Sequence, residues 1–108
     1  MSEEDTNPED ELDMRTRLNL ECGQISWQEI EILFARGMAM YVAPQLDLIE
    51  VAALTAENDA EKMQGWADQG LVGAMTIEQA KDWQTRGPEL WSVVVAPWAF
   101  VQERKTKH

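Results

Sequence analysis

Apolar residues recur at helical spacing in five segments of the chain, at about residues 14–22, 27–36, 48–57, 60–69 and 77–86. In the first segment, Met14, Leu18 and Cys22 fall on one helical stripe. Trp66 and Trp83 fall on the inward stripes of the last two segments, which predicts core positions. Short polar side chains precede the other four segments, at Ser26, Asp47, Asp59 and Thr76. Such side chains accept hydrogen bonds from the first amides of a helix, so the pattern predicts five helices.

Three runs rich in apolar, β-branched or aromatic residues lie between or after these helices, at 38–42, 71–75 and 90–102. Pro97 interrupts the last run, and its missing N–H predicts a bulge or an edge position there. We predict an α+β fold with a small sheet of about three strands. From residue 27 onward the predicted order is helix–strand–helix–helix–strand–helix–strand, which is similar to the order in winged-helix domains.

In a winged-helix domain, the segment 60–69 would be the helix that enters the DNA groove. It carries one basic residue, Lys62, against Glu61 and Asp68, whereas a recognition helix carries several Arg or Lys. The whole chain has a net charge of −11, which repels a polyanion. We therefore expect no nucleic-acid partner.

The negative charge is concentrated at the N-terminus. Seven of the twenty acidic residues lie in the first thirteen positions, and the remaining thirteen acids face nine bases. The leading segment has too few apolar side chains to offset its own ordering entropy. We predict a disordered acidic arm at 1–11, one globular domain at 12–103 and a short basic tail at 104–108.

Cys22 is the single cysteine, so an intramolecular disulfide is impossible, which fits a reducing compartment. The N-terminus lacks the basic and apolar regions of a secretory signal. The longest apolar run is far shorter than the roughly 20 residues that span a bilayer. We therefore expect a cytoplasmic protein with no membrane partner.

The chain offers few residues for catalysis. The single histidine, His108, is the last residue of the sequence, which disfavours a Ser–His–Asp triad and a His-based zinc site. There is no Gly-rich phosphate loop, which disfavours a nucleotide-binding loop. Cys22 lies on an apolar stripe, as a structural thiol does. Asp47 and Glu50 remain candidates for a ligand surface, against the alternative that they cap a helix and face solvent. We expect no metal ion and no cofactor.

Four further residues are candidates for an interaction or ligand surface. Arg17 and Glu21 are four positions apart on the first predicted helix, where they form either a surface ion pair or an anchor for a partner's charge. Trp91 and Trp98 lie in the last run. They either pack in the core or present an aromatic surface on an edge strand.

A combination of segments has a recognisable composition: RLNLE at 17–21, FARG at 34–37, LDLIEVA at 46–52, AEND at 56–59, Trp66, GLV at 70–72 and LWSVVVAPW at 90–98. Together they cover about residues 14–102 and resemble a small bacterial family known as domain of unknown function 2288. The resemblance implies a bacterial protein and no established activity for any residue.

These observations favour a non-catalytic protein-interaction or regulatory module. Its partner would be another protein or a second copy, bound through the last run, whose edges exceed what two short strands cover. The alternative is a small ligand-binding protein or enzyme that uses carboxylates and a Trp-lined pocket. A winged-helix nucleic-acid binder is the third hypothesis.

Overall fold

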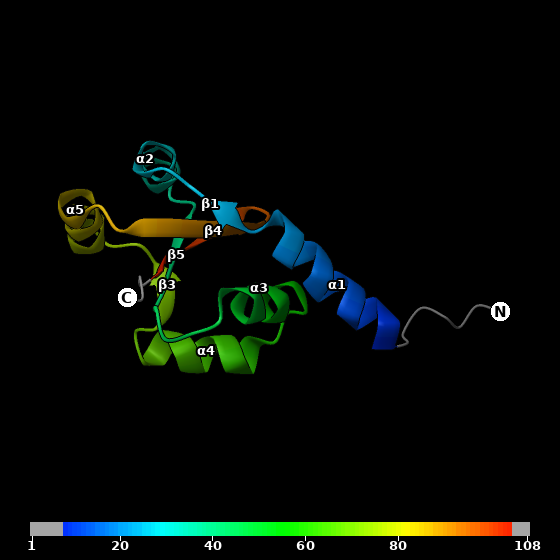
Figure 1. Ribbon diagram of the computed structural model, residues 1–108. Coiled ribbons are helices and arrows are strands. Elements are labelled where there is room, and N and C mark those ends of the chain that lie inside the picture. The colour runs from blue at the N-terminus through cyan, green and yellow to red at the C-terminus, as the bar shows by residue number, and fades with distance from the viewer. Residues whose placement is uncertain (1–7, 105–108) are drawn as a thin grey trace.

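The computed structural model describes residues 8–104, with side chains from Met14 onward (Figure 1). Residues 1–7 of the predicted acidic arm and residues 105–108 of the predicted tail lie outside this part of the chain. The helices are α1 Pro8–Glu21, α2 Trp27–Ala35, α3 Leu48–Ala56, α4 Ala60–Asp68 and α5 Ile77–Arg86. The strands are β1 Gly23–Gln24, β2 Ala39–Val42, β3 Val72–Ala74, β4 Glu89–Val95 and β5 Trp98–Arg104.

The five strands form one mixed sheet in the order β1-β4-β5-β2-β3. β2 and β5 run parallel, and every other neighbouring pair is antiparallel. The predicted α+β class is therefore confirmed, with five strands in place of about three. The two additional strands are β1 and the second half of the predicted last run.

The last apolar run is a hairpin, so the prediction of one strand over 90–102 is wrong. β4 and β5 pair antiparallel from Glu89 opposite Arg104 to Val95 opposite Trp98. Pro97 lies in the turn between them, at neither a bulge nor a sheet edge. β5 is covered on both sides, by β4 and β2. The predicted long open edge is thus reduced to the outer side of β4.

The winged-helix arrangement is not confirmed. A wing is a hairpin made by the strand after the recognition helix and the next strand. Here α5 separates β3 from β4, and within residues 8–104 the strand paired with β3 is β2. The parallel pairing of β2 with β5 also differs from an all-antiparallel wing sheet. The order of elements alone did not determine which strands pair.

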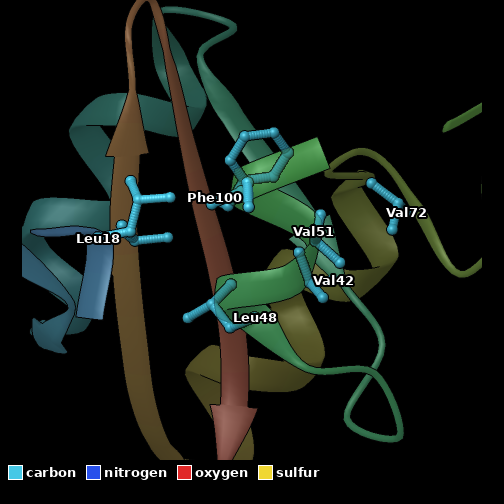
Figure 2. Close-up of a cluster of buried hydrophobic side chains, with 9 residues drawn as sticks. Leu18, Val42, Leu48, Val51, Val72 and Phe100 are labelled. Atoms are coloured by element: carbon cyan, nitrogen blue, oxygen red, sulfur yellow. The ribbon is translucent and has the colours of Figure 1, made fainter. Parts of the chain in front are cut away.

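Helices cover both faces of the sheet, and each face has its own core (Figure 1). α1 and α3 pack with α4 on one face, while α2 and α5 pack on the other. The side chains labelled in Figure 2 belong to the first core and come from α1, α3 and three strands: Leu18, Val42, Leu48, Val51, Val72 and Phe100. The second core includes Ile30, Leu90 and Trp83, which is 2% exposed as predicted. Trp66 is only partly buried against the first core.

Four of the five predicted helix starts are confirmed by hydrogen bonds, whereas α1 begins at Pro8, earlier than the predicted start near residue 14. The Ser26, Asp47 and Asp59 side chains each accept from a backbone amide of the helix that follows. At Thr76 the capping box is complete, because Thr76 Oγ1 accepts from the Gln79 amide at 3.1 Å and the Gln79 side chain accepts from the Thr76 amide at 3.0 Å. These local bonds explain why the boundaries could be predicted without tertiary information.

A polar cluster of Asp82, Trp83, Arg86 and Glu103 links α5 to β5 by hydrogen bonds. The Arg86 guanidinium donates to both oxygens of Glu103 at 2.9 and 3.0 Å and to Asp82, while the Trp83 indole donates to Glu103 at 3.2 Å. The hydrogen bonds from Arg86 are the main reason that the pKa of Glu103 lies below its usual value. Ionised Glu103 therefore stabilises the folded state.

The Glu103→Gln variant is expected to lose about 1 kcal/mol of stability at neutral pH, a value reduced by the exposure of Arg86. Gln keeps an acceptor for the Trp83 indole, so the loss reports the charge. Because the folded-state pKa of Glu103 is lowered, its contribution is complete above the unfolded-state pKa and disappears as the pH falls through the folded-state pKa. Urea unfolding at several pH values measures this, and the exposed Glu31→Gln serves as control. A stability difference that persists in acid would contradict the assignment.

Candidate interaction surface and pocket

Asp47 and Glu50, two of the candidate ligand residues, have structural partners. Asp47 Oδ1 accepts from the amides of Ile49 at 3.0 Å and Glu50 at 3.4 Å, and so caps α3. The Glu50 carboxylate pairs with Arg15 at 2.5 Å, which ties α3 to α1. Within the described part of the chain, no group of three or more His, Cys, Asp or Glu side chains is arranged to hold a metal ion. Asp47 therefore stabilises the start of α3, and Glu50 contributes to the packing of α1 on α3.

Trp91 is also engaged within the domain. The Arg104 guanidinium lies over the Trp91 ring, 4.2 Å from its centroid, and the Trp91 indole donates to Glu89 at 2.6 Å. The side chain is half-buried and packs against the first core. Of the two tryptophans in the last run, Trp98 is the more exposed, at 38%.

Three of the other candidates lie near the turn of the β4–β5 hairpin. Arg17 and Glu21 of α1 line a pocket of about 210 Å³ together with Val94 and Val95 of β4. Trp98 is the residue opposite Val95 across the hairpin. We call these five residues the tip surface. Figure 1 shows the end of the β4–β5 hairpin next to the C-terminal part of α1.

At the tip surface, no strand among residues 8–104 pairs with the outer edge of β4. β1 pairs Gly23 with Ser92 and Gln24 with Trp91, and no strand among residues 8–104 continues this pairing toward Val94. Backbone groups alternate sides along a strand, so those of Val94 face the same side as those of Ser92. The Val94 side chain is 57% exposed. The C-terminal part of α1 lies beside this part of β4, so the exposed Val94 side chain, and not a free backbone edge, is what a partner reaches.

A second pocket, of about 380 Å³, was missed by sequence reasoning. It lies between α4, the end of α3 and the β2–β3 end of the sheet, and we call it the α4 pocket. Its lining residues are Met40, Thr55, Asn58, Ala60, Met63, Gln64, Ala67, Val72 and Gly73. Ala60, Met63 and Ala67 lie on one helical stripe of α4. Two small residues on that stripe, Ala60 and Ala67, could have indicated a pocket from the sequence, because small side chains leave space between the helix and the sheet.

Cys22 is half-buried against the first core, which agrees with a structural thiol. Burial raises its pKa above the usual value, so the protonated and weakly nucleophilic form dominates at neutral pH. His108 lies outside the described residues. The side chains that usually carry nucleophilic catalysis are therefore not assembled around Cys22 within the described part of the chain.

The fold is that of a small α+β domain with a mixed sheet between two layers of helices. None of the helices among the described residues combines the length and the apolar character required to cross a membrane. The chain belongs to the family described as protein of unknown function (DUF2288), whose model matches residues 13–103. The resemblance inferred from the sequence is thereby confirmed.

The chain is also similar to a solved structure, the NMR solution structure of PA1075 from Pseudomonas aeruginosa. The two are 37% identical with a TM-score of 0.77, and the match covers 100% of this chain and 96% of that one. No curated protein matches the sequence detectably. The family description states no activity.

Proposed function

We propose that the protein is a non-catalytic module that binds another protein through the tip surface. The observation that carries this proposal is the position of Val94 and Trp98. These two exposed apolar side chains flank one hairpin turn, beside the pocket that contains Arg17 and Glu21. Because side chains alternate along a strand, Trp98 lies on the face of the first core and Val94 on the opposite face. Exposed apolar groups favour contact with a second chain.

The side chains of the tip surface suit protein recognition. Tryptophan and arginine are the residues most often found to dominate binding energy at interfaces. Trp98 offers a large apolar group, and Val94 adds an exposed apolar side chain at the other side of the hairpin turn. Arg17 donates to a carboxylate in a fixed geometry, and Glu21 accepts from a basic group. Together the two charges orient the partner.

The partner is a different protein and not a second copy of this chain. A net charge of −11 per chain makes the approach of two copies unfavourable, whereas a neutral or basic partner is attracted. The same charge supports the absence of a nucleic-acid partner. The partner presents an apolar recess for Trp98, with charges that match Arg17 and Glu21.

The Val94→Lys variant tests the proposal. A lysine at this position places a hydrated charge where the partner's apolar contact lies. The amount of each partner protein that Val94→Lys captures from extracts of the native host is expected to be at least about tenfold below the amount that the wild type captures. That decrease corresponds to a loss of roughly 1.4 kcal/mol of binding free energy. Quantitative mass spectrometry measures the capture.

The matched control is Ile77→Lys, which makes the same kind of change at another exposed apolar residue, 62% exposed on α5. It is expected to capture the same proteins as the wild type. Both variants should melt within a few degrees of the wild type, because neither position is buried. Equal capture by Val94→Lys and wild type would refute a role for the tip surface.

A further inference from the structure

The α4 pocket is separate from the tip surface and differs from it in chemistry. Its lining combines the thioethers of Met40 and Met63 with small or β-branched side chains and three uncharged polar residues, Thr55, Asn58 and Gln64. Its volume, about 380 Å³, lies within the range of small-molecule sites in proteins. Methionine side chains adapt to varied apolar shapes. The pocket therefore has the size and walls of a ligand site.

No ionisable side chain is among the lining residues of the pocket, which excludes a charged ligand. A cation in the pocket would lose its hydration without gaining a carboxylate partner. An anion would be repelled by Glu57, Asp59, Glu61 and Asp68, which lie on or beside α4 with Lys62 as the single base between them. A neutral molecule avoids both costs.

The polar groups in the pocket specify a hydrogen bond. Thr55 Oγ1 already donates to the Val51 carbonyl at 2.9 Å. The Gln64 amide nitrogen donates to Asp68 at 2.8 Å, which leaves the Gln64 carbonyl oxygen as an acceptor. A ligand with a hydroxyl or N–H group supplies the matching donor.

The helix that forms one wall has no fully buried side chain holding it to the sheet. Gly65 lies within this helix, where glycine lowers helix stability by roughly 0.5–1 kcal/mol relative to alanine. A small outward shift of α4 admits a ligand without disturbing the central strands. We propose that the α4 pocket binds a neutral, largely apolar small molecule that donates a hydrogen bond to Gln64.

Two probes test the proposal on the ¹⁵N-labelled full chain by NMR titration: 2-naphthol, which has a hydroxyl donor, and 2-methoxynaphthalene, which does not. Both are expected to give saturable shifts at the amides of Gln64, Ala67 and Gly73. 2-Naphthol is expected to bind roughly threefold tighter or more, as one hydrogen bond implies. Gln64→Leu is expected to abolish that preference while both probes still bind.

Ala67→Trp fills the pocket and is expected to abolish binding of both probes. Ala60→Trp fills it from the start of α4 and serves as the second variant if the first fails to fold. Lys81→Trp adds the same side chain to the exposed side of α5 and should bind like the wild type. The proposal is overturned by an absence of saturable shifts, by unchanged binding in a folded pocket-filling variant, or by shifts that occur at Val94 and Trp98 instead. It is equally overturned if the preference for 2-naphthol survives in Gln64→Leu.

Discussion

Replacing Trp83 with Ala is expected to lower the free energy of unfolding by about 3–5 kcal/mol, the usual cost of removing a buried aromatic side chain. Trp83 is 2% exposed in the second core, and its ring lies 5.7 Å from that of Tyr41. The substitution also removes the indole donor to Glu103. The loss therefore combines a large cavity with a broken link between α5 and β5.

Urea unfolding followed by far-UV circular dichroism measures this loss. Trp98→Ala makes the same chemical change at a residue that is 38% exposed, and it is expected to cost no more than about 1 kcal/mol. Two losses of similar size would mean that Trp98 is as buried as Trp83. That result would contradict the tip surface as well as the two-core arrangement.

Replacing Gln102 with Leu is expected to destabilise the protein by about 2–4 kcal/mol. Gln102 is 6% exposed on β5, and its side-chain amide donates to the carbonyls of Ala43 at 2.9 Å and Leu46 at 2.7 Å. These carbonyls belong to the connection between β2 and α3. Leucine has a similar volume but no donor, so the Leu46 carbonyl loses its hydrogen bond and the Ala43 carbonyl keeps only the one from the Leu46 amide at 3.1 Å.

For a domain of this size the loss corresponds to a fall in melting temperature of more than about 8 °C. Gln84→Leu, at an exposed position of α5, is the control and is expected to shift the melting temperature by only a few degrees. A Gln102→Leu variant as stable as the wild type would show that water replaces the Gln102 amide at both carbonyls.

Most of the successful predictions came from sequence features that act over a few neighbouring residues. The side chains of Ser26, Asp47, Asp59 and Thr76 satisfy amides within three residues of themselves, so a short window of sequence defines each helix start. The inward position of Trp83 followed from helical periodicity in the same way. Such features depend on neighbours along the chain and not on the rest of the fold.

Features that depend on distant partners were missed. β1 has two residues, Gly23 and Gln24, whose extended conformation follows from pairing with Ser92 and Trp91 far along the chain. A polar residue such as Gln102 gives no sign of burial until the carbonyls of another loop lie within reach. The division of the last run at Pro97 was misassigned, because proline is found both at strand edges and in turns.

The candidate residues show the same limit. Arg17, Glu21 and Trp98 come from opposite ends of the chain, and only the docking of α1 beside β4 brings them to one surface. Asp47 and Glu50 are explained by a helix cap and by the ion pair with Arg15. The α4 pocket depends on the spacing between α4 and the sheet, which residue periodicity does not report.

Site-specific photo-crosslinking in the native host tests most directly whether the tip surface binds another protein. The photoreactive residue p-benzoylphenylalanine replaces Trp98 in one variant and Ile77 in a control. A discrete product is expected at position 98, heavier than the 12.3 kDa chain and containing a second, different protein, with no such product at position 77. No product at position 98, the same products from both positions, or a product made of two copies of this chain would contradict the binding of another protein through the tip surface.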